Sequence, residues 1–446
     1  MADADRPAVR VLIAGAGIGG LAAAVSLARV SEIPDLDIQL YEQAPELREI
    51  GASIALSPNG MRTLERLGVH EALSDEVGFR GPSGIPQIFR HWKTNQVVSV
   101  DTHTSVTDRR HQTTRFHRAH IHAALLAHVP RSCIHLGKRV ARAKASDDSV
   151  ELIFDDGSTA AGDVLIAADG IRSKVRQSLL PDYHLTFTGK VFMRSVFEAS
   201  LVEGKIPDLP ADAVHWWGPR DNFFASKLGK GQYTIVGAYE EARPAHEVDK
   251  TVAWDQLGSV SFLRERFQTW NPVVKALTEA TPSVRLYPNY VGTALPTWLP
   301  APRVALLGDA AHTHGGAFAA GGSLALDDAL ALGLAFRHVV RSGRAGVAAF
   351  LRTGRGTQHA LELYDRTRRP HVARLLDIVH AQLQTDPAVS RSPEEQEEAL
   401  MAKLKSRPDT TWLSEHDVEK ALRDEVAKRE VQQAGNGGST FHDSKL

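Results

Sequence analysis

The amino-acid sequence predicts an α/β protein in which a doubly wound parallel sheet is interrupted by an inserted mixed β-sheet domain and followed by a helical C-terminal region. The first observation is an apolar run at residues 10–14, which precedes a glycine-rich turn and an alanine-rich helical stretch from Leu21 to Val30. The second is the return of similar runs at residues 163–168 and 303–307, which we interpret as buried strands of the same sheet. The third is the stretch between these two runs, where aromatic and β-branched residues alternate with polar ones.

These changes of pattern set the expected domain boundaries. Residues 1–180 and 295–384 would form the two parts of the parallel-sheet domain, and residues 181–294 the inserted domain. Residues 385–431 are charged and have a helical pattern, so we expect a C-terminal helical region there. Residues 432–446 are rich in small and polar residues and are predicted to be a flexible tail.

Composition excludes several classes of function. The formal net charge of −1 gives no long-range field that would recruit nucleic acid. No apolar run reaches the ~20 residues that a membrane-spanning helix needs. Cys133 is the only cysteine, so no disulfide can form within the chain, which suits a reducing compartment. The histidines within residues 111–122 do not have the spacing of a closed metal site, and we predict no bound metal.

The final tripeptide, Ser444-Lys445-Leu446, matches the address that a peroxisomal import receptor reads at a C-terminus. The polar stretch before it favours the exposure that such a receptor needs. We therefore expect a peroxisomal location, with the import receptor as a partner, and otherwise a cytoplasmic one. Monomer and homodimer are both compatible with the sequence.

A dinucleotide-binding motif follows the first expected strand. Gly15, Gly17 and Gly20 make the pattern G-x-G-x-x-G at a strand-to-helix turn. The first glycine permits the tight turn, the second lets the backbone approach a pyrophosphate, and the third lets helix and strand pack closely. Glu42 ends the second expected strand, where a carboxylate accepts hydrogen bonds from the adenosine ribose hydroxyls. The pattern predicts a Rossmann-like domain that binds FAD or NAD(P), without distinguishing the two.

Three further segments favour FAD by resemblance. Residues 163–176 read DVLIAADGIRSKVR, residues 308–312 read GDAAH and residues 116–126 read FHRAHIHAALL. With the glycine motif and residues 51–68, they resemble the class A FAD-dependent aromatic monooxygenases, especially the salicylate-hydroxylase-like branch common in fungi. The resemblance extends over roughly residues 9–380 and is more specific for the family than for the substrate.

The resemblance implies an oxidoreductase that binds FAD and uses NADPH or NADH together with O2. Reduced flavin would form a C4a-hydroperoxide that hydroxylates a small phenolic substrate, with or without a carboxylate and with or without loss of CO2. An FAD-dependent epoxidase or oxidase of a non-aromatic metabolite is the alternative. A halogenase is disfavoured because Trp216 and Trp217 are adjacent, which does not fit W-x-W-x-x-P. A plain NAD-dependent dehydrogenase would leave GDAAH unexplained, and a flavin-binding protein without catalysis would not turn over substrate.

The resemblance also implies residue roles. The three motif glycines and Glu42 would hold the ADP half of FAD, and Arg118 would contact its flavin side. Ala55 lies in the stretch beyond Gly51 that contacts the cofactor in the family. Asp169-Gly170 is the segment associated with both FAD and NAD(P)H. Asp309 would bind the ribityl chain, and the helix start at Gly321-Gly322 would offer N–H groups to the isoalloxazine.

Two segments depart from the family pattern. The family usually has a proline four residues after His312 and an asparagine near the flavin, and here these positions are Gly316 and Ser323. In the inserted domain, a His and a Tyr-Pro common in relatives are replaced by Asn222 and by residues 226–227. The identity of a catalytic base is therefore open.

Three residues are candidates for contact with the substrate. Arg194, on an expected strand of the inserted domain, could pair with a phenolate or carboxylate, or could form a structural ion pair instead. His215 could act as a base or hydrogen-bond donor, although a histidine satisfied by the backbone is the commoner case. His314 lies in the altered flavin loop and could reach the substrate.

Overall fold

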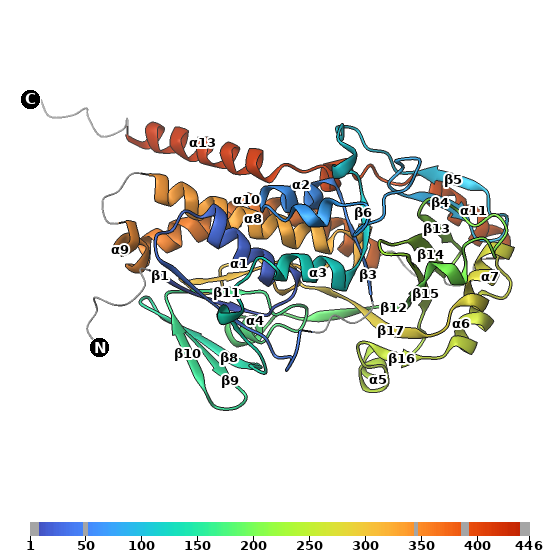
Figure 1. Ribbon diagram of the computed structural model, residues 1–446, viewed down its shortest axis with the longest axis horizontal. Coiled ribbons are helices and arrows are strands. Elements are labelled where there is room, and N and C mark those ends of the chain that lie inside the picture. The colour runs from blue at the N-terminus through green and yellow to red at the C-terminus, as the bar shows by residue number, and fades with distance from the viewer. Residues whose placement is uncertain (1–8, 48–51, 343–346, 385–391, 438–446) are drawn as a thin grey trace, which may run out of the picture.

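The computed structural model describes residues 9–47, 52–342, 347–384 and 392–437, which form two large sheets with their covering helices (Figure 1). The tripeptide Ser444-Lys445-Leu446 lies outside the described residues. Within these ranges, no helix has both the length and the apolar character needed to cross a membrane.

The parallel sheet forms because its strands are short apolar runs that are buried on both faces. β1 (Val9–Ala14) pairs in parallel with β2 (Leu36–Tyr41) on one side and with β11 (Val164–Ala167) on the other. The full order is β18-β11-β1-β2-β7, with β18 (Val304–Leu306) and β7 (Ile134–His135) at the edges. Because the order reverses direction at β1, this is the doubly wound sheet predicted from the sequence.

Helices cover one face of this sheet, and a small antiparallel sheet lies on its other side (Figure 1). The helices of this layer are α1 (Ile18–Val30), α3 (Arg118–Leu126), α8 (Gly321–Arg341) and α10 (Arg355–Gln384). α1 and α8 approach so closely that a Cβ on Gly333 would stand 2.3 Å from Oγ of Ser26, and the glycine permits this contact. The small sheet consists of β8 (Val140–Ala145), β9 (Val150–Phe154) and β10 (Thr159–Gly162). Further elements of this domain are α2 (Pro58–Arg66), β3 (Ser53–Leu56), β6 (Thr114–His117), α4 (Lys174–Leu179) and α9 (Val347–Arg352).

The second sheet has the order β16-β17-β12-β15-β14-β13-β4-β5. Its side chains alternate between two environments: Val191 and Met193 lie in a core with α6 and α7, whereas Phe192 and Arg194 face the opposite side. The strands are β4 (Ile88–His91), β5 (Val97–Val100), β12 (Leu185–Glu198), β13 (Val214–Trp217), β14 (Asn222–Lys227), β15 (Gln232–Glu240), β16 (Gln256–Gly258) and β17 (Val284–Gly292). The helices are α5 (Ala245–Thr251), α6 (Val260–Phe267) and α7 (Pro272–Ala280).

Two strands of this sheet come from outside the inserted stretch. β4 pairs in parallel with β13, with Ile88 beside Val214, and β5 continues the sheet beyond β4. The inserted domain expected at residues 181–294 is therefore completed by a segment of the first 180 residues. The segment with β4 and β5 therefore connects the parallel-sheet domain to the second sheet.

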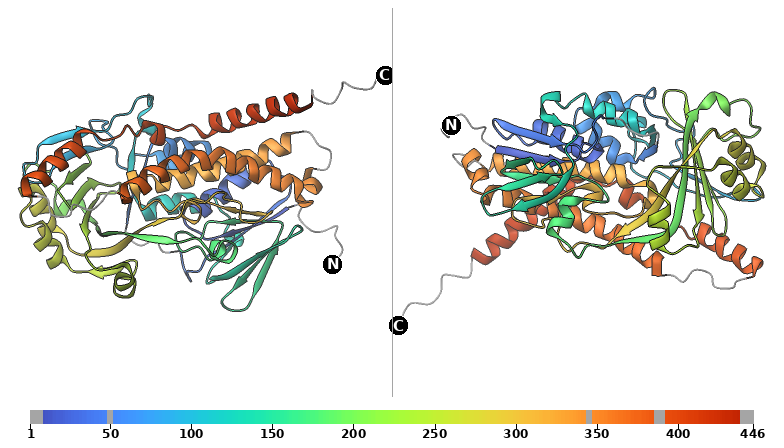
Figure 2. Two further views of the ribbon diagram at one scale, coloured as in Figure 1. Left: turned by 180° about the vertical axis from the view of Figure 1, so that it is seen from behind. Right: turned by 90° about the horizontal axis from the view of Figure 1, so that it is seen from below.

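The helical C-terminal region crosses both domains (Figure 2). α11 (Pro393–Lys405) lies beside β5 and buries Leu400 and Leu404 against Phe89, and α12 (Thr411–Ser414) follows it. We call residues 392–417 the C-terminal arm. α13 (Val418–Gly437) then returns along α10 and α8. α13 continues to Gly437, so residues 432–437 of the expected tail are helical in the structure.

Glu415 anchors the C-terminal arm to the body of the protein. Its carboxylate accepts hydrogen bonds from the backbone N–H groups of Thr104 and Ser105, each at 2.7 Å. Arg62 of α2 donates to the backbone carbonyl of Glu415 at 2.7 Å. These contacts hold the arm against the connection between the two domains.

Candidate functional site

In the glycine turn between β1 and α1, neighbouring backbone atoms leave no room for a side chain at the first and third glycines. Gly15 has a φ of +97°, which L side chains rarely adopt, and a Cβ there would stand 2.5 Å from the carbonyl oxygen of Ala168. A Cβ on Gly20 would stand 1.9 Å from the carbonyl oxygen of Gly15. At Gly17, by contrast, the nearest atom to such a Cβ is Nη2 of Arg118 at 3.8 Å. The backbone at Gly17 is thus open to the approach of a pyrophosphate.

Glu42 follows β2 and lies directly beside this turn. Its Oε2 accepts a hydrogen bond from the N–H of Ala16 at 2.8 Å, and its Oε1 accepts one from the N–H of Ala44 at 2.8 Å. The carboxylate of Glu42, at the end of β2, therefore lies at the glycine turn, as the sequence spacing predicted. Its contact with a ribose stays a prediction.

Asp169 and Gly170 follow β11 on the other side of the glycine turn. Oδ2 of Asp169 accepts hydrogen bonds from the N–H groups of Lys174 at 2.8 Å and Val175 at 3.2 Å, so the side chain caps α4. Its Oδ1 is buried and has no hydrogen-bond partner in the described part of the chain, and burial raises the pKa of the carboxyl. A buried acceptor without a protein partner beside this turn fits a site that a bound cofactor completes.

Asp309 lies in the short turn after β18, next to the start of α8. Gly308 and Ala310 on either side are buried, whereas Asp309 itself is exposed. Its backbone carbonyl accepts a hydrogen bond from Arg176 at 3.2 Å, which fixes the turn. A Cβ on Gly321 would lie 4.0 Å from Oδ1 of Asp309, so the carboxylate and the N-terminus of α8 are neighbours. This places an acceptor for ribityl hydroxyls beside a positive helix end.

The start of α8 packs tightly against β3. A Cβ on Gly322 would stand 2.6 Å from Cδ1 of Ile54, the neighbour of Ala55. The N–H of Ser57 donates to Oγ of Ser323 at 2.8 Å. Ser323, which stands where the family usually has asparagine, therefore anchors the backbone between β3 and α2.

The loop before α8 has an unusual backbone. Gly315, Gly316, Phe318 and Ala319 all have φ between +52° and +67°. Proline, with φ near −65°, cannot adopt the conformation of Gly316, so the backbone of this loop would not accept the family's usual proline at this position. The left-handed conformation costs the two non-glycine residues on the order of 1 kcal/mol each or more. Such strain is typical of loops that contact a ligand.

These residues fit FAD. Gly17 would face the pyrophosphate, Glu42 the adenosine ribose and Asp309 the ribityl chain, while the N–H groups at the start of α8 would face the isoalloxazine. Arg118 begins α3, and its backbone N–H donates to the carbonyl of Ala52 at 2.8 Å. The guanidinium of Arg118 lies at the open side of the glycine turn, with Nη2 at 3.8 Å from a Cβ built on Gly17.

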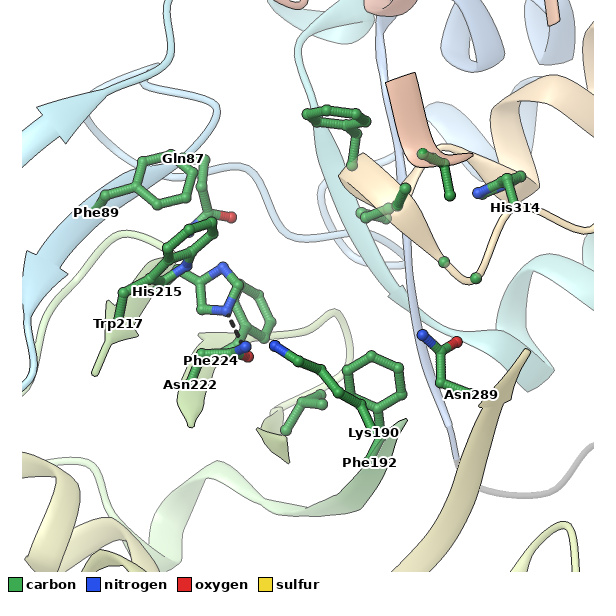
Figure 3. A pocket seen from close by; sticks show the side chains of 18 of the residues that line it. Gln87, Phe89, Lys190, Phe192, His215, Trp217, Asn222, Phe224, Asn289 and His314 are labelled. Atoms are coloured by element: carbon green, nitrogen blue, oxygen red, sulfur yellow. Dashed lines mark hydrogen bonds between the residues drawn. The ribbon is translucent and has the colours of Figure 1, made fainter. Parts of the chain in front are cut away.

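A cavity of about 1380 Å³ separates the second sheet from the parallel-sheet domain. Its sheet wall is aromatic, and Figure 3 shows Phe89, Phe192, Trp217 and Phe224 along it. The opposite wall consists of β3, β6 and residues 314–319, which is the side where the isoalloxazine would lie. The C-terminal arm supplies a further wall with residues between 403 and 414. An apolar pocket with a few polar groups is typical of a small-molecule site.

Cationic side chains outnumber acidic ones on these walls. Three of the cations lie in ion pairs: Arg266 with Asp221 at 2.6 Å, Arg407 with Asp101 at 3.1 Å and Arg220 with Glu240 at 4.0 Å. The excess of positive charge favours an anionic ligand. The lining cations are Arg115, Lys190, Arg194, Arg220, Arg266, Lys403 and Arg407, and the lining acids are Asp101, Glu240 and Glu241.

Arg194 lines the pocket from β12. Its guanidinium carbon lies 5.2 Å from the ring centre of Tyr287, and its Nε is buried without a hydrogen-bond partner among the described residues. Tyr287 itself donates to Asp255 at 2.5 Å and so does not neutralise the arginine. Burial lowers the pKa of Arg194. The structure therefore presents a desolvated cation that can bind an anion in the pocket.

His215 lines the same pocket from β13. Its Nε2 donates to Oδ1 of Asn222 at 3.0 Å, which leaves Nδ1 as the acceptor in the neutral ring. Burial lowers its pKa to about 4, and the positive charges of Arg407, Lys190 and Arg115 lower it further. His215 is thus uncharged at neutral pH and serves better as a hydrogen-bond acceptor than as a group that keeps a proton.

His314 faces His215 from the other side of the pocket (Figure 3). A Cβ on Gly321 would lie 3.3 Å from its Nε2, and its Nδ1 is buried without a hydrogen-bond partner in the described ranges. Burial lowers its pKa to about 4. The three candidate substrate residues therefore share one pocket, with His314 at the expected flavin end, and their catalytic roles stay predictions.

Of the seven lining cations, sequence reasoning identified only Arg194 and missed the other six. Lys190 stands four residues before Arg194 on β12, so the two-residue period of a strand places both side chains on the same face. This period could have identified Lys190 as a pocket residue from the sequence. Arg115 directly precedes the segment 116–126 that carried the resemblance, but its burial gave no sequence signal. Lys403 and Arg407 belong to the C-terminal arm, whose docking site no local pattern encodes.

No family model matches the chain. The chain is 31% identical over 379 residues to 6-hydroxynicotinate 3-monooxygenase from Bordetella bronchiseptica, and the match covers 83% of this chain and 90% of that relative. A solved salicylate hydroxylase substrate complex has a TM-score of 0.72 at 25% identity and covers 94% of this chain and 98% of its own. HpxO of Klebsiella pneumoniae, complexed with FAD and uric acid, shares the fold with a TM-score of 0.69 at 24% identity, covering 94% of this chain and 96% of its own. These matches confirm the resemblance found in the motifs. The chain belongs to the family of FAD-dependent aromatic monooxygenases.

Proposed function

We propose that this monooxygenase hydroxylates a small anionic hydroxyarene and takes its electrons from NADPH or NADH. The observation that carries the proposal is the pocket itself, which combines aromatic walls with an excess of cations at the boundary between the cofactor cleft and the second sheet. Flat aromatic side chains suit a planar ring, and desolvated cations suit a phenolate or carboxylate.

Bound FAD would accept electrons from the nicotinamide and activate O2. The chain's own part is to hold the substrate ring and to favour its more electron-rich phenolate form. Arg194 and the buried Arg115 lower the free energy of a phenolate relative to the neutral phenol. Nδ1 of His215 can accept a hydrogen bond from a substrate hydroxyl. With a pKa of about 4, His215 is uncharged at neutral pH and acts as a hydrogen-bond acceptor without keeping a proton of its own on Nδ1.

The test uses the purified holoenzyme with NADPH or NADH and the ortho, meta and para hydroxybenzoates. Substrate-stimulated oxidation of the nicotinamide with a hydroxylated product, measured by chromatography together with released CO2, is the expected result. Oxidation that yields only hydrogen peroxide with every hydroxyarene would contradict the proposal. Turnover of a non-aromatic alkene in its place would favour the epoxidase alternative.

The variant Arg194→Met should lower kcat/KM for the substrate by roughly tenfold to a hundredfold, since a charge-assisted hydrogen bond contributes on the order of 1.5–3 kcal/mol. Flavin content and melting temperature should stay close to wild type, because Arg194 makes no ion pair among the described residues. The matched control is Arg285→Met on the neighbouring strand, which loses an exposed pair with Asp255 at 2.8 Å outside the pocket. Equal kinetic effects of the two substitutions would argue against a substrate contact for Arg194.

A further inference from the structure

Three cations gather at the end of the pocket that lies away from residues 314–319. We call Lys190, Lys403 and Arg407 the distal cation cluster. Lys190 comes from β12, and its side chain points toward His215 and Asn222 (Figure 3). The other two come from the C-terminal arm, so the cluster joins two segments separated by about two hundred residues of sequence.

The two arm residues rest on the aromatic wall. The guanidinium carbon of Arg407 lies 3.4 Å from the ring centre of Phe89, and Nζ of Lys403 lies 4.9 Å from the ring centre of Trp217. Such stacking fixes the positive groups at the surface of the pocket without neutralising them. Leu400 and Leu404 of α11 pack against the same aromatic side chains and hold the helix in place.

Acidic groups compensate only part of this charge. Asp101 pairs with Nη2 of Arg407 at 3.1 Å, while Nε of Arg407 is buried without a hydrogen-bond partner among the residues described. Glu240 attracts Lys403 but lies in a long pair with Arg220 at 4.0 Å. In the part of the chain that the structure describes, neither Lys190 nor Lys403 has an ion pair. The like charges of the cluster repel one another, and an anion bound between them would offset this repulsion.

The positive charge of the distal cation cluster shifts the pKa values of neighbouring groups. The positive charges of Lys190 and Arg407 add to burial in lowering the pKa of His215, and they also lower the pKa of Lys403 after partial desolvation of its ammonium group. The positive potential of the cluster is therefore concentrated in one small volume beside His215 and Trp217. That volume lies across the pocket from the expected isoalloxazine.

We propose that the distal cation cluster is a carboxylate subsite, built jointly by β12 and the C-terminal arm. This inference rests on the proposed function and names the substrate class more closely as hydroxyarene monocarboxylates. The carboxylate binds at Lys190 and Arg407, and the ring lies along Phe192 and Phe224 with its reacting edge toward residues 314–319. The C-terminal arm is thus a determinant of substrate specificity and not only a cover.

The test measures the binding of matched probes to the oxidised holoenzyme by the change they cause in the flavin spectrum. The probes are the ortho, meta and para hydroxybenzoates and the corresponding hydroxybenzamides, which keep the ring and hydroxyl but carry no charge. In Lys190→Met and in Arg407→Met, Kd for the best hydroxybenzoate should rise at least about tenfold, and Kd for its amide should change by less than about twofold. Lys405→Met, an exposed neighbour on α11 outside the pocket, should leave both values unchanged.

The outcomes separate the subsite from the proposed function. Equal losses for the acid and the amide would overturn the subsite, because the cations would then only shape the pocket, and so would wild-type affinity in both variants. Charge-dependent binding without hydroxylated product would retain the subsite and overturn the proposed function. Should Lys190→Met unfold at a lower temperature than wild type, Lys190→Gln and Arg407→Lys give the same comparison, with Arg407→Lys expected to retain part of the affinity for the acid.

Discussion

Replacing Gly20 with alanine should yield a protein that melts several degrees below wild type and purifies without flavin. A Cβ at this position would stand 1.9 Å from the carbonyl oxygen of Gly15, which is backbone and cannot move aside as a side chain can. Overpacking of this kind costs roughly 3 kcal/mol or more, because α1 must shift away from β1. The measurement is the melting temperature together with the ratio of flavin to protein absorbance in the purified protein.

The informative control is Gly17→Ala in the same turn. At Gly17, φ is −71° and the nearest atom to an added Cβ lies at 3.8 Å, so alanine fits the ligand-free chain without strain. We expect the melting temperature of the flavin-free protein to stay unchanged while the Kd for FAD rises at least about tenfold, because the new methyl group occupies the approach of the pyrophosphate. Full flavin occupancy in Gly17→Ala would mean that the pyrophosphate does not cross this turn.

The contrast between these two glycines also shows what the sequence could predict. The site expected for the ADP half lies within one strand-turn-helix-strand unit, so the spacing of Gly15, Gly20 and Glu42 carries nearly all the information for predicting it. The position of Asp309 could be predicted equally well from the sequence, because this residue lies shortly after β18, a buried strand that its apolar run identifies. Local patterns of this kind determine local structure, and the structure agrees with them.

The substrate side could be predicted only in part. Arg194, His215 and His314 were identified and share one pocket, but β4 was not assigned to the sheet that carries His215. Strand pairing across more than a hundred residues depends on which edge the folded core leaves open, and a four-residue strand carries too little pattern to specify that. The same holds for Arg407, since α11 finds Phe89 through tertiary packing alone.

Asp328 should prove the most costly carboxylate of the chain to replace. Its Oδ2 accepts hydrogen bonds from Nε2 of His312 at 2.6 Å and from the N–H of Gly308 at 3.1 Å, and its Oδ1 accepts one from Nε of Arg368 at 2.9 Å. The side chains of His312, Asp328 and Arg368 are fully buried. Removing the charge leaves a buried arginine without its closest counter-charge, so Asp328→Asn should lower the free energy of unfolding by about 3–5 kcal/mol. It should also lower flavin content, because Gly308 begins the turn that presents Asp309.

The adjacent Asp327 provides the matched comparison. It accepts hydrogen bonds from Asn59 and Thr63, each at 2.8 Å, but lies 3.9 Å from Arg368, and burial raises its pKa. Because its charge contributes little to stability, Asp327→Asn should cost only about 1–2 kcal/mol for a disturbed hydrogen bond. Denaturant unfolding of both variants measures the difference, and equal costs would contradict the assignment of Asp328 as the counter-charge.

The pH dependence gives an independent check on Asp328. Burial alone would raise its pKa, but the attraction of His312 and Arg368 and their hydrogen bonds outweigh burial, so the folded-state pKa lies below the ordinary value. A carboxyl with a depressed folded-state pKa stabilises the fold fully above its unfolded pKa of about 4 and loses this contribution as pH falls through the folded value. The difference in unfolding free energy between wild type and Asp328→Asn should therefore be constant near neutrality and shrink below about pH 4. A difference that grows on acidification would mean that the charge of Asp328 opposes folding, which the three hydrogen bonds to its carboxylate argue against.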